Sequence, residues 1–289
     1  MNIKNIILAA AVAIATGCAK EALGRMPANN DTLATVTAPT TPADSVQYYT
    51  DKARWGDPTA YLKLAQYSHD GLLSGKPDML NTLSWYGMAQ LYGAIPDTDE
   101  AIAQLPDGDW LKTAYTLMDG AMNLTDKEAA ATLIDQMMAS GIPDAYVLQA
   151  LSVRAADPDA ALGLLRKGTD EGSALAKLCW ETAHSSTDLN DNPEMMERMA
   201  DVMPIANMML GQYYSGQRQD SVIDYDKAIV YYRKAEQKAT LDSWGANFLL
   251  WAIRENLTTP ADSTETSRLK ALSNANPNHE EDGYGEESD

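Results

Sequence analysis

The sequence predicts an all-α protein in which helix-turn-helix hairpins stack into an α-solenoid. Three observations predict it: an apolar pattern that recurs along most of the chain, an acidic residue at a fixed distance before it, and a small residue at a fixed distance after it. The chain has 289 residues, of which 45% are hydrophobic, so it can fold as one large or two modest domains. We expect the solenoid to occupy residues 44–256.

Six segments carry the recurring pattern, a pair of apolar residues followed by another core-type residue four positions after the first. In most of them a small residue stands at position eight. Positions 0, 4 and 8 lie on one face of a helix, so each segment predicts a helix with one buried stripe. The pairs are Tyr48-Tyr49, Trp85-Tyr86, Leu133-Ile134, Leu164-Leu165, Met195-Met196 and Tyr231-Tyr232.

The ends of these helices follow from the same spacing. An Asp seven residues before a pair can accept a hydrogen bond from a first-turn amide and thus mark the helix start. A Gly eight residues into the pattern suits the left-handed residue that often ends a helix. The aspartates are Asp78, Asp126, Asp157, Asp188 and Asp224, and the glycines are Gly56, Gly93, Gly141 and Gly172.

The segments between one Gly and the next Asp have room for a second helix, in the short repeats about 12 residues long. Ala60, Ala145 and Ala176 each stand four residues after a repeat Gly and begin an apolar run. Residues 242–256 predict a terminal helix that covers the last repeat. Residues 257–289 carry many acids and few large apolar side chains, so we expect a disordered acidic tail.

One repeat unit resembles a known family. Ala206 to Tyr214, followed by Asp224 to Ala235, resembles the Sel-one-like repeat, a branch of the tetratricopeptide-type α-solenoids. Residues 60–93 resemble a second copy, and the resemblance covers roughly residues 44–241, less well in its middle. It implies a concave binding face and a role as a protein-binding scaffold or adaptor.

The first residues predict an export signal. A basic residue at Lys4, the apolar stretch 6–15 and small residues before Cys18 form a secretory signal peptide over residues 1–17. Ala15-Thr16-Gly17-Cys18 resembles a bacterial lipobox, which implies acyl chains on Cys18 and a lipoprotein of a Gram-negative cell envelope, with the outer membrane favoured. Residues 18–43, rich in Ala, Thr and Pro, then predict a flexible tether.

Fourteen Tyr and six Trp against a single Phe suggest surfaces that bind a partner, because these rings pack while presenting a polar atom. The partner is expected to be another envelope protein. The alternative is a carbohydrate or peptidoglycan binder whose Tyr and Trp rings stack on sugars. The candidate partner-binding residues are Tyr67, Tyr92, Tyr115, Tyr146, Tyr213 and Tyr214.

Other functions find little support. A net charge of −19 disfavours nucleic acid as the main partner. His69, His184 and His279 are isolated, and no catalytic or nucleotide-binding motif occurs, so we expect neither an enzyme nor a metal or cofactor. Cys179, in an apolar helical stretch, predicts a buried inert thiol. The Met residues at 195–209 suit core filling better than soft-metal binding.

Overall fold

A computed structural model describes residues 41–118, 124–185, 189, 192–217 and 221–276. Within these residues the chain forms fourteen helices and no strand, apart from an isolated bridge between Met118 and Leu124. Consecutive helices pack against each other along the chain, which confirms the all-α solenoid. None of the helices in this described part is long and apolar enough to cross a membrane.

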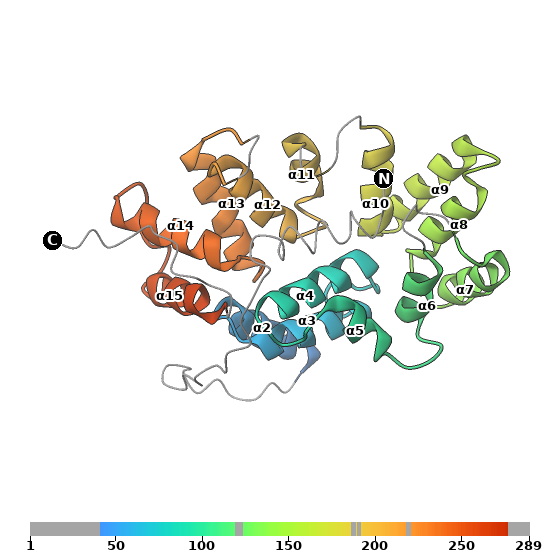
Figure 1. Ribbon diagram of the computed structural model, residues 1–289, viewed down its shortest axis with the longest axis horizontal. Helices are drawn as coiled ribbons and strands as arrows, with labels where there is room; N and C mark the ends of the chain where they lie inside the picture. The colour runs from blue at the N-terminus through green and yellow to red at the C-terminus, as the bar shows by residue number, and fades with distance from the viewer. Residues whose placement is uncertain (1–40, 119–123, 186–188, 190–191, 218–220, 277–289) are drawn as a thin grey trace.

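Helices α2 to α15 follow one another in hairpins, with two short helices, α5 and α6, filling the longest interval between apolar pairs (Figure 1). Their bounds are α2 Pro42–Arg54, α3 Pro58–His69, α4 Met79–Leu91, α5 Thr98–Ala103, α6 Trp110–Leu117, α7 Lys127–Ala139, α8 Ala145–Val153, α9 Pro158–Asp170, α10 Ala174–Ala183, α11 Pro193–Met199, α12 Ile205–Tyr214, α13 Tyr225–Gln237, α14 Ser243–Arg254 and α15 Glu265–Ala275.

Four of the five predicted helix starts are confirmed. The side chains of Asp78, Asp126, Asp157 and Asp224 each accept a hydrogen bond from a first-turn amide. Thr41 takes this role for α2, also seven residues before its apolar pair. Asp188 lies outside the described residues, and α11 begins later than the pattern predicts, with Asn192 as its cap.

The predicted helix ends are confirmed as well. All four predicted glycines have left-handed backbone torsions, with φ between +69° and +93°. In the last copy of the pattern, Ala239 adopts the same conformation at φ +58°. A left-handed residue therefore ends the helix even where the sequence offers no glycine.

The solenoid folds back on itself, which the repeat pattern does not predict. Helices α10–α14 lie over helices α2–α5, and α6–α9 join the two layers at one end (Figure 1). At the other end α15 lies beside α2, where Ala275 packs against Gly56. Several hydrogen bonds join the layers. Asn81 Nδ2 donates to the Val202 carbonyl at 2.8 Å, the Tyr92 hydroxyl donates to the Leu241 carbonyl at 3.2 Å, and Arg54 of α2 donates to Glu236 of α13.

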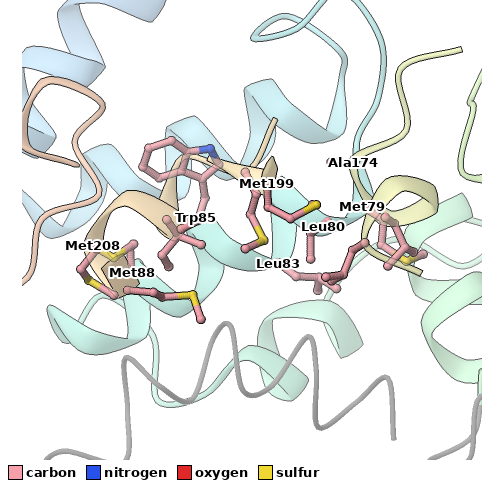
Figure 2. Packing of buried hydrophobic residues seen from close by; sticks show 14 of the residues in the cluster. Met79, Leu80, Leu83, Trp85, Met88, Ala174, Met199 and Met208 are labelled. Carbon is pink, nitrogen blue, oxygen red and sulfur yellow. The ribbon is translucent and has the colours of Figure 1, made fainter. Parts of the chain in front are cut away.

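The core between the layers is rich in methionine. Figure 2 shows Leu83, Trp85 and Met88 of α4 beside Met199 of α11 and Met208 of α12. Ten of the thirteen residues of α4 are buried, on all sides of the helix. The concave face that a solenoid would leave open is therefore covered over this length by the chain's own α4. The methionines at 195–209 are fully buried, in agreement with core filling.

The expected boundaries need two corrections. Residues 257–289 were expected to be disordered, but α15 lies within them and packs on α14, so α14 is not the terminal helix. Leu269 and Leu272 supply its buried apolar side, while Glu265 and Arg268 are buried in ion pairs. Ion-pair partners on another helix allow this polar segment to fold, and the composition of the segment does not reveal those partners. The solenoid also starts at Pro42 rather than residue 44.

Candidate protein-interaction surface

The exposed large apolar side chains of the described chain are concentrated beside one helix. Four of the six lie within nine residues, just before α13 and in its first two turns, and we call these four the α13 surface. Val222 is 55% exposed, Ile223 66% and Val230 50%, and Tyr225 is exposed to a lesser degree. The other two, Leu72 and Leu257, stand elsewhere in the chain. Clustered exposed apolar groups of this kind often mark a protein-binding site.

Local structure explains why Val230 points outward. Asp224 caps α13 and fixes where the helix begins. The opposite side of α13 is committed to the core, through Ala228, Ile229, Tyr232 and Ala235. Val230 therefore falls on the outer side, since residues two positions from Ala228 and Tyr232 lie far round the helix.

Aromatic rings border this surface and hold each other in place. The ring centroid of Tyr225 lies 5.3 Å from that of Trp251 on α14, in an edge-on arrangement. Tyr214 of α12 and Tyr231 of α13 are stacked, with centroids 5.8 Å apart. Lys227 Nζ lies 4.6 Å from the Tyr214 ring centroid. Such ring and cation contacts fix side-chain positions at low entropic cost.

Glu197 of α11 ties the tyrosines to the neighbouring hairpin. Its Oε1 accepts a hydrogen bond from the Tyr231 hydroxyl at 2.9 Å and one from the Tyr214 hydroxyl at 3.4 Å. Burial, and then the hydrogen bond to Glu197, raise the pKa of Tyr231. The Tyr231 hydroxyl is protonated at neutral pH and donates this hydrogen bond.

The structure brings together two of the six tyrosines predicted from the sequence. Tyr213 and Tyr214 are neighbours at the end of α12, with rings edge to face at 5.2 Å, next to the α13 surface. Tyr67 lies apart, against Tyr49 of α2. Tyr146 lies under Lys167 of α9, with the ammonium 4.9 Å from the ring centroid.

For the remaining two candidates the structure argues against a role in binding. Tyr92 is wholly buried, stacks on Tyr61 at 5.1 Å and donates to the Leu241 carbonyl, so the prediction that it contacts a partner is wrong. Its position between the two layers, which the sequence does not reveal, is the physical reason. Tyr115 is also buried, and its hydroxyl donates to Asp99 on α5 at 2.5 Å.

Residues that could support metal or thiol chemistry are engaged elsewhere. The ring nitrogens of His69 face Asp70 at 2.8 Å and Asp109 at 3.1 Å, and its ring stacks on Trp110. Within the part of the chain that is described, no group of three or more His, Cys, Asp or Glu residues could hold a metal ion. Burial raises the pKa of Cys179 to about 12, as expected for an inert thiol.

Comparison with known proteins adds little to this picture. No protein-family model matches the chain, and no curated protein matches its sequence. Among solved structures the chain is similar to the crystal structure of a Sel1 repeat protein from Oxalobacter formigenes, at 14% sequence identity and a TM-score of 0.34. The match covers 81% of this chain and 99% of that chain. So low a score carries no argument about function, and the solenoid stands on the helices themselves.

Sequence reasoning missed the apolar residues of the α13 surface. Val222 and Ile223 lie outside every predicted helix, between a polar segment and the cap Asp224. Their signal in the sequence is that they form an apolar pair that belongs to none of the predicted helix stripes. Val230 precedes the pair Tyr231-Tyr232, and only the orientation of α13 shows that it points away from the core.

Proposed function

We propose that the chain is a lipid-anchored scaffold of the bacterial cell envelope that binds a partner protein at the α13 surface. The observation that carries this proposal is that four of the six exposed large apolar side chains of the described residues lie between Val222 and Val230, in and just before a helix whose aromatic rings are held by neighbouring helices. The anchor rests on the lipobox-like Ala15-Thr16-Gly17-Cys18, which lies outside the described residues.

The geometry favours a protein partner over a glycan. A sugar ring stacks on the open face of an aromatic side chain. Here Tyr214 and Tyr231 stack on each other, and Lys227 and Lys234 lie over their rings, with the Lys234 ammonium 4.9 Å from the Tyr231 centroid. Tyr214 and Tyr231 therefore do not present the open ring faces that the carbohydrate or peptidoglycan alternative would need.

A photo-crosslinking residue at position 230 tests the binding surface. Placed in the full-length protein in intact cells, it is expected to give one crosslinked protein product that disappears when Ile223 is changed to Asp. The matched control is the same residue at position 72, because Leu72 is 48% exposed but stands alone. An identical set of products from both positions, or none from position 230, would contradict the proposed surface.

Replacing Cys18 by Ala tests the anchor. We expect the wild-type protein to sediment with membranes and the variant to move at least about tenfold into the soluble fraction, since the acyl chains supply the membrane affinity. Cys179→Ala is the control, because it removes the other cysteine, which is buried in α10. A Cys18→Ala protein that still sediments as fully as wild type would refute the lipid anchor.

A further inference from the structure

Two buried carboxylates lie close together where the lower layer, α2–α5, is joined to the upper layer, α10–α14. Asp78 is the cap of α4 and is 5% exposed, and Asp144 stands immediately before α8 and is 1% exposed. Asp144 also reaches the start of α10, where Ser173 is the cap. The N-termini of three helices therefore converge on one carboxylate pair: α4 of the lower layer, α8 of the connecting segment and α10 of the upper layer.

Hydrogen bonds from α4 and from the cap of α10 fix the geometry of this joint. Asp144 Oδ2 accepts from the Met79 amide of α4 at 2.7 Å, and its Oδ1 accepts from the Ser173 hydroxyl at 2.5 Å. Asp78 accepts from the backbone and the side-chain amide of Asn81 at 2.9 and 2.8 Å. Because Asp144 binds the amide of the residue next to Asp78, the two acids are held close together.

No ion pair offsets this charge within the residues that the structure describes, because neither carboxylate forms one with Lys, Arg or His there. Burial, and then the charge of Asp144, raise the pKa of the Cys179 thiol in α10, and Arg154, at the end of α8, acts on the same thiol in the opposite direction. The nearby Lys76 is paired instead with Glu171 at 3.0 Å, in a contact that is about half exposed. Placing two ionised carboxylates in such a site costs free energy from both desolvation and repulsion.

We propose that this joint is a proton-dependent contact, in which a proton on one of the two carboxyl groups holds α4 against α8 and α10. Loss of that proton leaves two negative charges in the buried joint and weakens the attachment between the layers. The device acts on the shape of the scaffold itself and does not depend on which partner it binds.

The direction of the pH dependence follows from the two acids. Burial, and then the charge of Asp144, raise the pKa of Asp78 to about 7, and burial also raises the pKa of Asp144. In the unfolded chain Asp78 would titrate near 3.8. The folded state thus holds a proton that the unfolded state releases between about pH 4 and pH 7. The stability contributed by this proton is complete at the acidic end and is lost as the pH rises through 7.

The test compares the full-length protein with Asp78→Asn by urea unfolding at several pH values between 5 and 8. Asn is a good helix cap, so the variant retains the cap while losing the charge. We expect the unfolding equilibrium constant of the wild type to rise at least tenfold more than that of the variant over this range. Asp144→Asn should reduce the rise in the same way.

The matched control is Asp126→Asn, which changes the same repeat position at an exposed cap. It should leave the pH dependence at its wild-type size. Hydrogen exchange of the wild type, corrected for intrinsic rates, should show less protection of the amides in the first turn of α4 at pH 8 than at pH 5. If both joint variants retain the full pH dependence, or if Asp78→Asn only shifts stability equally at every pH, the proton-dependent contact does not exist.

Discussion

Changing Glu236 to Ala is expected to lower the free energy of unfolding by about 3–5 kcal/mol, the usual cost of leaving buried charges without their partner. Glu236 of α13 is 4% exposed and accepts hydrogen bonds from two arginines. Arg54 Nη2 of α2 lies 2.9 Å from its Oε1, and Arg268 Nε of α15 lies 2.6 Å from the same atom. This one carboxylate therefore fastens the first and last described helices to α13.

The measurement is urea unfolding followed by circular dichroism, with Glu171→Ala as the matched control. Glu171 also forms an ion pair, with Lys76, but both side chains are about half exposed. Its loss should cost less than about 1 kcal/mol because exposed ion pairs contribute little. Equal losses for the two variants would show that Glu236 does not hold the ends of the solenoid together.

Gly211→Ala is expected to destabilise the protein by about 1–3 kcal/mol, the typical cost of overpacking a core. A methyl group at this position of α12 would overlap the Tyr232 ring of α13, with Cε1 at 2.6 Å and Cγ at 2.8 Å. Gly245 of α14 faces the same ring, where an added Cβ would lie 2.7 Å from Tyr232 Cδ1. The ring thus fills the space that two glycines leave between three helices.

Gly163→Ala is expected to have the opposite effect on stability, because the space around Gly163 is open. No atom lies within 4 Å of a Cβ built at Gly163 in α9. Alanine there should raise the free energy of unfolding by about 0.5–1 kcal/mol, since glycine is a poor residue for a helix interior. Thermal unfolding of both variants gives the comparison, and a stabilised Gly211→Ala protein would contradict the packing of Tyr232.

Much of the local structure could be predicted from the chain because it depends on near neighbours in sequence. Asp126 caps α7 and Gly141 ends it through contacts within a few residues, so spacing alone locates both. The α12–α13 hairpin was predictable for the same reason. Only part of the α13 surface could be predicted. Tyr213 and Tyr214 at its border were among the predicted residues, whereas the exposure of Ile223 and Val230 depends on how the chain around α13 packs on the core.

The sequence by itself determined where most of the repeat helices begin and end and that they pair into hairpins, because those features arise from interactions over one or two turns. Only the tertiary structure decided that the solenoid folds back, that Tyr92 becomes core and that α15 is ordered. Asp78 and Asp126 make the contrast plain. Both occupy the same position of the repeat and cap a helix, yet Asp78 alone lies buried beside a second carboxylate, since the packing of distant helices sets its surroundings.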